Sequence, residues 1–403
     1  MTASDRFTAF HTLPKEVPPP PPMATTESCS FHWKLGLFDI KCMTTDHYTG
    51  GMKQHYRVKS CGWQRPTFEI PCTKTYYIAA EEVEWDYSPN RTWEHEMYMM
   101  EDVSPGDVFL NKGEKFIGSK YKKAVYQEYT DKTFTKRKEK KEHMGILGPL
   151  IMANVGDKIK IIFNNKASRP YSIYAHGVKT DSVSVMPTKP GDTQAYIWKV
   201  PERSGPAMNG DPDCLTWAYY SKVDQVKDTY SGLIGPLVIC KRLLFGLQEP
   251  KTRFSLLFMV FDENKSWYLD DNIQTYSLHP EDVNKEDEEF LESNKMHGIN
   301  GKMYGNLLGL TMQVGEKVRW HLIGMGNEVD IHTVHFHAHS FQYQAFRKNV
   351  GSVCGNFAHL AKRGQALMLD KKEQTQAETG KGLPQTVATK IEAPNCLKYL
   401  FLL

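Results

Sequence analysis

The chain has 403 residues, and its 50 Lys and Arg against 47 Asp and Glu leave a formal net charge of +3. This near-balance gives no electrostatic case for binding nucleic acid, and no apolar run approaches the roughly 20 residues that a transmembrane helix needs. The length is sufficient for two or three domains. Aromatic residues make up 12% of the chain, a content that favours β structure.

The N-terminal segment, residues 1–35, contains five consecutive prolines at 18–22, and we expect it to be extended and poorly ordered. It lacks a basic stretch followed by an apolar one, so it does not read as a secretory signal. The C-terminal segment, residues 344–403, has few aromatic residues and no alternating pattern. We therefore expect it to be disordered.

Between these two segments, short runs rich in Val, Ile, Tyr and Phe are separated by turn sequences such as SPN, NKG and KPGD. This pattern predicts an all-β chain built of β-sandwiches or Greek-key barrels. An acidic run, 280–294, is expected to be helical or 3₁₀. The expected strands include KTYYIAAEEVEWDY (74–87), GDKIKIIFNN (156–165), AYIWKV (195–200), LIGPLVIC (233–240), RFSLLFMVF (253–261) and GEKVRWHLIGM (315–325).

Two of these runs form an internal repeat, in which residues 156–178 parallel residues 315–339. Each copy has a Gly-acid-Lys turn, an alternating strand, a polar loop and a strand that ends at a histidine. Aligning them places Tyr174 opposite His335, and His176 opposite His337. The sequence therefore predicts two related β domains, and a structural role for the first, which lacks the full set of histidines.

The run HTVHFHAHSFQY, residues 332–343, is the densest cluster of potential metal ligands. On a regular strand, His335, His337 and His339 share one face and His332 lies on the other. Two imidazoles in a His-x-His pair on one face suit two neighbouring metal ions, and copper, zinc, iron and nickel all accept imidazole. The alternative is a set of packed or surface histidines.

A second candidate ligand set is KCMTTDHYTGGM, residues 41–52, which holds Cys42, His47 and Met52 at a Cys-x4-His-x4-Met spacing. A thiolate, an imidazole and a thioether in one short loop match three of the four ligands of a blue-copper centre. The alternative is a coincidental loop of the same composition.

Long stretches of the chain resemble the vertebrate multicopper ferroxidases of the ceruloplasmin and hephaestin family. They include TTDHYTGGMKQHYRV, YYIAAEEVEWDYSPNRTWE, HMGILGPLIMANVGDKIKIIF, DENKSWYLDDNIQTY, ESNKMHGINGKMYGNL and GMGNEVDIHTVHFHAHSFQY. The resemblance covers roughly residues 36–343 and implies tandem cupredoxin-like Greek-key domains. It implies the end of one domain at 36–62, a complete domain at 75–243 and an incomplete one at 252–343, with 1–35 and 344–403 outside the match.

The same resemblance implies copper as the cofactor, in blue type 1 and trinuclear type 2/type 3 centres, with iron(II) and dioxygen as substrates. It also implies an extracellular or exoplasmic location, and an iron exporter or a transferrin-type acceptor as partner. The implied ligands are His332 for a blue copper, His335 and His337 for the trinuclear cluster, Cys42, His47 and Met52 for a further blue copper, and Glu292 and His297 for iron.

The chain departs from the family pattern after residue 343, where no His-Cys-His motif follows. The cluster would receive only two of its histidines from this chain, so we expect little or no oxidase activity from the polypeptide alone. The alternative is a non-catalytic cupredoxin module, like the domains of blood-coagulation cofactors. A zinc hydrolase that uses the histidine run lacks a placed general base.

Three further features concern processing. Cys214 and Cys240 flank the last hairpin of the 75–243 domain, and we expect either a disulfide, which would indicate an oxidising compartment, or two buried thiols. Asn90-Arg-Thr and Asn264-Lys-Ser are glycosylation sequons, a pattern that is also a common chance match.

Overall fold

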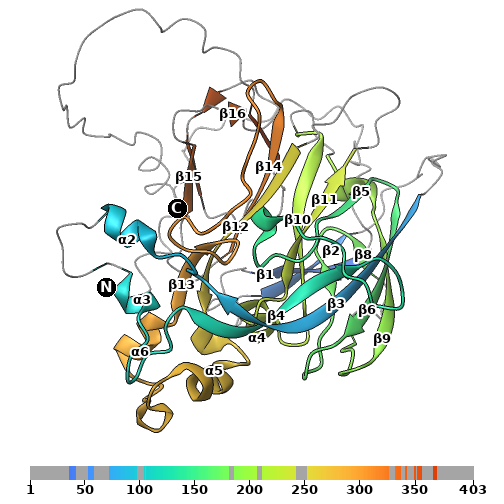
Figure 1. The fold of residues 1–403 in the computed structure, drawn as a ribbon. Coiled ribbons are helices and arrows are strands. Elements are labelled where there is room, and N and C mark those ends of the chain that lie inside the picture. Colours follow the sequence, from blue (N-terminus) through green and yellow to red (C-terminus); the bar gives the residue numbers. More distant parts are fainter. Residues whose placement is uncertain are drawn as a thin grey trace, which may run out of the picture. The chain divides into compact units, whose positions relative to one another are not determined.

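The all-β prediction is confirmed in the computed structural model, which is dominated by strands and has short helices between them (Figure 1). A hairpin of β1 (Gly36–Lys41) and β2 (Lys53–Val58) comes first in the chain. The structure describes residues 36–41, 53–58, 72–97, 104, 106–180, 186–206, 211–241, 252–325, 332–336, 341–342, 349–350, 352–355 and 366–369.

The first sandwich is formed by two sheets, with strand orders β4-β3-β6-β9-β8 and β5-β11-β10-β7. Strand β3 begins beside β6, which runs parallel to it, and continues beside the antiparallel β4. On β6, Ile159, Ile161 and Phe163 are buried while Lys158 and Lys160 are exposed, as expected for a strand with one face in the core. The strands are β3 (Thr73–Asp86), β4 (Lys120–Tyr129), β5 (Ile151–Asn154), β6 (Lys158–Asn165), β7 (Tyr174–Ala175), β8 (Lys179–Thr180), β9 (Thr193–Lys199), β10 (Cys214–Tyr220) and β11 (Ile234–Cys240).

The second group of strands has the order β13-β12-β14-β19-β16-β17, with a separate pair of β15 and β18. Strand β14 runs parallel to β12, just as β6 runs parallel to β3. The internal repeat therefore appears as the same strand pairing in both halves. The strands are β12 (Thr252–Asp262), β13 (Lys295–Ile299), β14 (Val318–Gly324), β15 (His332–His335), β16 (Phe341–Gln342), β17 (Asn349–Val350), β18 (Ser352–Gly355) and β19 (Ala366–Leu369).

The sheet that contains β12 and β14 is buried on both faces. One face, which includes Phe254 and Leu256, packs with Val334 of β15. The other face, which includes Leu257 and Met259, packs in a cluster with Ile234 of the first sandwich. Burial on both faces explains why these strands read as nearly continuous apolar runs rather than as a strict alternation.

A buried ion pair connects β4 of the first sandwich with the end of β12. Lys123 and Glu263 are both fully buried, and the Lys123 ammonium donates to the Glu263 carboxylate and to the carbonyl of Tyr230. The Tyr87 hydroxyl donates to the same carboxylate. Burial lowers the pKa of Lys123 and raises the pKa of Glu263, so the contact satisfies two groups that are costly to remove from water.

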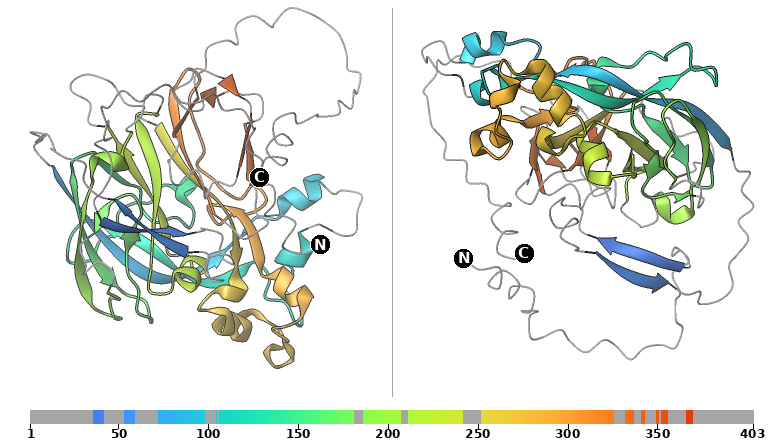
Figure 2. Two further views of the ribbon diagram at one scale, coloured as in Figure 1. Left: turned by 180° about the vertical axis from the view of Figure 1, so that it is seen from behind. Right: turned by 90° about the horizontal axis from the view of Figure 1, so that it is seen from below.

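The helices are short and lie in the connections. Asp224 caps α4 by accepting from the amides of Val226 and Lys227, and α3 lies beside α6 (Figures 1 and 2). The helical prediction for 280–294 is confirmed by η6 and α6. In the described part of the chain, no helix is long and apolar enough to span a membrane. The helices are α2 (Thr92–Met97), α3 (Asp107–Leu110), η2 (Glu142–Met144), η4 (Glu202–Ser204), α4 (Gln225–Tyr230), η5 (Glu263–Lys265), α5 (Leu269–Tyr276), η6 (Pro280–Asp282) and α6 (Glu288–Ser293).

Two expectations concern the ends of the chain. Residues 1–35 and 370–403 lie outside the described residues. Within 344–403, where disorder was expected, the structure has the short strands β17, β18 and β19. Strand β19 pairs with the free edge of β14, whose unpaired backbone groups favour the addition of a strand even where side chains show no alternation.

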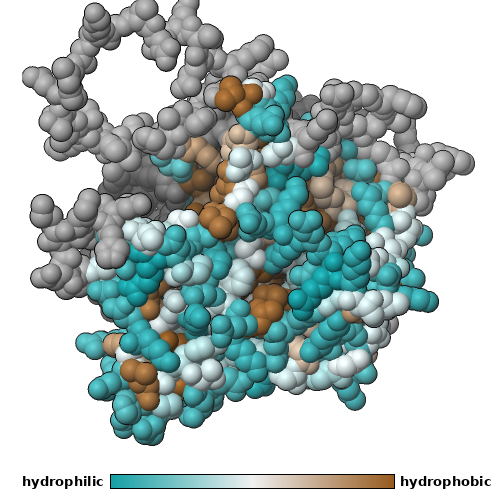
Figure 3. Space-filling view, in the orientation of Figure 1, coloured by the Kyte–Doolittle hydropathy of each residue, from teal (hydrophilic) through white to brown (hydrophobic). Residues whose placement is uncertain are grey.

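One face of the molecule is largely hydrophilic, with scattered apolar spots (Figure 3).

Candidate metal centre

Strand β15 carries the first two histidines of the predicted ligand run. It pairs antiparallel with β18, from His332 opposite Gly355 to His335 opposite Ser352. Val334 is buried in the core beside β12 and β14, and His332, two residues earlier, lies on the same face and is partly buried. His335 has the opposite parity and is exposed. The two imidazoles therefore face opposite sides of one strand, about 10 Å apart along it.

The His332 ring is held by its surroundings. Its Nε2 atom lies 3.4 Å from the carbonyl oxygen of Met325, and the ring lies 6.3 Å from that of Phe258. Within the described part of the chain, Nδ1 has no partner. A ring with one nitrogen on a backbone carbonyl and the other open is the usual state of a metal-ligating histidine, so His332 fits a copper ligand.

Several predicted ligands cannot be placed. His337 and His339 lie outside the described residues, as do Cys42, His47 and Met52. The structure therefore brings His332 and His335 onto one strand, and the remaining copper ligands stay predictions from the sequence.

The equivalent position in the first sandwich is an aromatic cluster. The Tyr174 ring packs edge-on against His176 with 5.6 Å between centroids, and the Tyr220 hydroxyl lies 2.5 Å from His176 Nε2. Tyr174 also pairs with Tyr220 across β7 and β10. A tyrosine ring thus occupies the place that His335 has in the repeat, which agrees with a structural role for this half.

The two predicted iron ligands lie on consecutive elements, Glu292 on α6 and His297 on β13, and both are exposed. The Glu292 carboxylate accepts from the Lys295 ammonium at 2.6 Å, and the His297 ring packs edge-on against Phe109 at 5.3 Å. Lys295 neutralises the charge that would attract iron, so binding requires this side chain to move.

Sequence reasoning missed a different group of potential metal ligands. His279, Glu281 and Asp282 are exposed and bring their ligand atoms within 4.8 Å of one another, the only such group of three in the described ranges. The signal was present as the His-x-acid-acid spacing at the start of the acidic run. Exposed acidic groups of this kind are common without a metal, and nothing else in the described structure points to an ion there.

The predicted cysteine pair and the two glycosylation sequons all lie in the described part of the chain. A disulfide joins Cys214 and Cys240, which face each other across β10 and β11, so the disulfide alternative is the one observed. Asn90 is exposed. Asn264 is partly buried, and its amide nitrogen donates to Asp262 at 2.9 Å and to the Leu291 carbonyl at 2.8 Å, contacts that a glycan on this nitrogen would disturb.

Comparison with known proteins gives these features a context. The sequence model of the family described as multicopper oxidase matches residues 128–243. Human ceruloplasmin is 62% identical over 316 residues, which is 77% of this chain and 30% of ceruloplasmin. Human hephaestin is 50% identical over 323 residues, which is 77% of this chain and 28% of hephaestin. The chain thus spans less than a third of the length of these curated relatives.

Among solved structures, the multicopper oxidase mgLAC has a TM-score of 0.44 and 16% identity over 74% of this chain and 76% of its own. The predicted resemblance, the cupredoxin-like fold class and copper as the cofactor of the family are confirmed by the family match and the two human relatives together. The chain is thus similar to the multicopper oxidase family over residues 128–243, and to ceruloplasmin and hephaestin over about three quarters of its length.

Proposed function

We propose that this chain forms part of a copper-dependent ferroxidase, which oxidises iron(II) to iron(III) and reduces dioxygen to water. The observation that supports this most strongly is the 62% identity with human ceruloplasmin over 77% of the chain, and strand β15 carries two of the proposed copper ligands. Because His332 and His335 face opposite sides of that strand, one strand can serve two copper centres. A single backbone segment would then connect the centre that takes electrons from iron with the centre that reduces oxygen.

In this proposal His332 is a blue-copper ligand, and His335 and His337 bind the trinuclear cluster. When bound, copper supplies one-electron redox chemistry that no side chain provides. The contribution of the chain is orientation. The Met325 carbonyl fixes the His332 ring, so that the other ring nitrogen can bind copper without a change of side-chain rotamer.

The loop with Cys42, His47 and Met52 is proposed to bind a further blue copper, on the strength of its spacing and its soft donor atoms. Glu292 and His297 are proposed to bind the iron substrate. Their exposure leaves them open to a hydrated ion. A carboxylate oxygen is a hard ligand and binds iron(III) more tightly than iron(II), which favours oxidation.

The proposed location is extracellular or exoplasmic, where iron(III) would pass to a transferrin-type acceptor, with an iron exporter as the source of iron(II). The Cys214–Cys240 disulfide supports an oxidising compartment. The chain offers two histidines to the trinuclear cluster, so we propose that sustained turnover also requires ligands from outside this polypeptide.

The test is copper loading of the purified chain, followed by metal analysis, absorption spectroscopy and oxygen uptake with iron(II). We expect His332→Ala to lose tightly bound copper, and the control Lys189→Ala, on an exposed side chain outside the candidate metal ligands, to keep it. Equal copper content in both variants would remove His332 from the site. Sustained oxygen consumption by the isolated chain would contradict the need for further ligands.

A further inference from the structure

The outer face of the first sandwich carries lysines on three neighbouring strands, β6, β9 and β8, which can be followed in Figure 1. Lys158 of β6 lies directly opposite Lys199 of β9, and Lys199 lies directly opposite Lys179 of β8. Paired residues of antiparallel strands share one face of the sheet and have Cα atoms roughly 5 Å apart. The strand register therefore brings these three side chains, here called the lysine row, next to one another.

The lysine row faces solvent. All three of its side chains are exposed, because the alternate residues of these strands, such as Ile159 and Trp198, fill the core on the other face. Lys160, two residues after Lys158 on β6, is exposed on the same face as the row. It adds a fourth cation about 7 Å along the strand. The surface thus extends in two directions, across the strands and along β6.

These four lysines have no counter-charge in the described part of the chain, where no ion pair or hydrogen bond joins their ammonium groups to another residue. The neighbouring acid, Asp157, is buried, and its carboxylate accepts from the Asn154 amide at 2.9 Å. Like charges directly opposite each other destabilise a sheet. The chain keeps them in register nonetheless, and a departure from a local rule without a compensating contact is typical of a functional surface.

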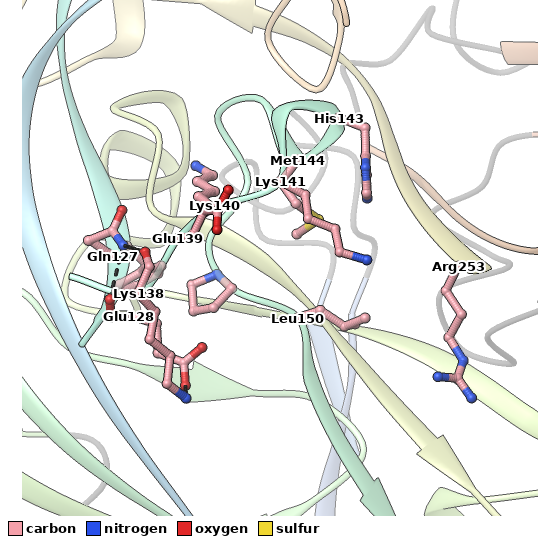
Figure 4. Close-up of a pocket in the computed structure, with 12 residues that line it drawn as sticks. Gln127, Glu128, Lys138, Glu139, Lys140, Lys141, His143, Met144, Leu150 and Arg253 are labelled. Carbon is pink, nitrogen blue, oxygen red and sulfur yellow. Dashed lines mark hydrogen bonds and ion pairs between the residues drawn. The ribbon is translucent and has the colours of Figure 1, made fainter. Parts of the chain in front are cut away.

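The cations around the pocket beside η2 are arranged differently. That pocket has a cavity volume of about 250 Å³, and the Lys138 ammonium donates to the Glu128 carboxylate at 2.6 Å (Figure 4). In the same view Lys140 and Arg253 lie at opposite ends of the pocket. Those cations are offset or apart, whereas the strand register holds the lysine row together.

We propose that the lysine row and Lys160 bind a linear sulfated polysaccharide. An extended polyanion can lie across the strands and meet a new ammonium group at each of them. Its binding releases condensed counter-ions, which favours association. Ammonium groups are strongly hydrated point charges, so they suit sulfate groups that stay at the protein surface and are not buried.

The neighbouring side chains favour a polysaccharide over other polyanions. Thr73 and Thr75 on β3 and Ile197 on β9 are the exposed register partners of Lys158 and Lys160, and the threonine hydroxyls can donate hydrogen bonds to sulfate or sugar oxygens. None of these described partners is aromatic, so the surface lacks the platform on which the bases of single-stranded nucleic acid stack. It also lacks the Trp, Tyr and Arg anchors that dominate protein interfaces. The extracellular or exoplasmic location proposed above would expose this face to such polysaccharides.

The test uses the full purified chain, with size-fractionated heparin as the probe. Binding is measured by isothermal titration calorimetry between about 50 and about 200 mM sodium chloride, because the logarithm of a polyanion affinity falls linearly with the logarithm of the salt concentration. Hyaluronan, which carries carboxylates but no sulfates, polyglutamate and a single-stranded oligodeoxynucleotide are titrated in parallel. We expect heparin to bind at least about tenfold more tightly than each of these three.

Two double variants test the surface. Lys158→Gln with Lys199→Gln should weaken heparin binding at least about tenfold and lower the salt slope by about two counter-ions. Lys112→Gln with Lys115→Gln removes the same charge from exposed lysines on the connection that leads to the far end of β3, and should change the affinity less than about twofold. The first variant should unfold in urea at a midpoint no lower than the wild type, because it removes opposed like charges. A loss of binding would then not reflect a loss of fold.

The proposal is overturned if heparin does not bind the wild-type chain, or if the two double variants weaken binding equally. Equal affinity for hyaluronan would show that sulfate is not recognised. Equal affinity for polyglutamate or for the oligonucleotide would replace the polysaccharide with an acidic protein or a nucleic acid as the class of partner. None of these readouts depends on copper or on oxidase activity, so failure here leaves the proposed function untouched.

Discussion

His321 on β14 should make the folded chain sensitive to mild acid. The ring is fully buried, and its Nδ1 atom lies 2.9 Å from the Thr216 hydroxyl of β10. Nε2 has no hydrogen-bond partner in the described structure. Burial, reinforced by the nearby guanidinium groups of Arg319 and Arg253, lowers the pKa of His321 to about 3. The folded chain therefore keeps this ring neutral at a pH at which the unfolded chain would protonate it.

The size of the effect follows from linkage. The unfolded chain takes up a proton near pH 6.5 and the folded chain near pH 3, so the stability from the neutral ring is complete above pH 6.5 and is lost as pH falls toward 3. Each pH unit in that window costs about 1.4 kcal/mol. Between about pH 7.5 and about pH 5, the expected loss is therefore about 2 kcal/mol.

The assay is urea unfolding of the wild-type chain and of His321→Gln at the two pH values. Other titrating groups contribute to both proteins and cancel in the difference between them. The variant is expected to be less stable at the higher pH, because the packing changes, but to lose about 2 kcal/mol less on acidification. His279→Gln, on an exposed side chain, is the matched control and should behave as the wild type.

An equal loss on acidification in His321→Gln and in the wild type would refute the reasoning. It would mean that the imidazole is hydrated or paired in the folded chain, so that its protonation no longer opposes folding. A loss in the control as small as in His321→Gln would show that the effect is not specific to the buried ring.

Three further predictions follow from buried contacts. Lys123→Met leaves the Glu263 carboxylate without a counter-charge and should cost about 3–5 kcal/mol of unfolding free energy, most of which the added Glu263→Leu should restore; denaturant unfolding of the single and double variants checks this. Cys214→Ala should cost about 3–4 kcal/mol in the same assay, because the disulfide no longer restrains the unfolded chain, and an equal loss for the wild type under reducing conditions is the control. In a chain expressed through a eukaryotic secretory pathway, glycopeptide mass spectrometry should find Asn90 occupied and Asn264 unoccupied, because the Asn264 amide nitrogen donates two hydrogen bonds; high occupancy of Asn264 would contradict this.

Much of the fold could be predicted because each strand carries its own signal. The alternation in GDKIKIIF placed the lysines of β6 outward and its apolar residues inward, as observed. The apolar run RFSLLFMVF likewise indicated β12, which is buried on both faces. The repeat predicted two related halves, because the same turn and strand pattern recurs. These are local features, and local sequence is sufficient to determine them.

The contacts between the halves could not be predicted. In KYKKAV of β4 three lysines look alike, yet Lys123 is fully buried because Glu263, 140 positions later, provides its counter-charge. Likewise, the sequence shows His321 only as one imidazole in an apolar strand. Its hydrogen-bond partner becomes apparent only when β10 packs beside it in the structure. At the predicted iron site, the sequence indicated Glu292 but gave no sign that Lys295 pairs with its carboxylate. Such partners depend on tertiary positions that no short window contains.

The burial of β12 and β14 on both faces has an evolutionary consequence. Alternate side chains of such a strand must fit different neighbours, one set in β15 and one in the first sandwich, so the strand as a whole is constrained from both sides. The two halves share one sequence pattern and one strand pairing, but neither half can replace the other. Recombination that exchanged either half alone would leave an apolar sheet face without its matching surface, so substitutions on β12 and β14 are expected to co-vary with residues of the preceding sandwich.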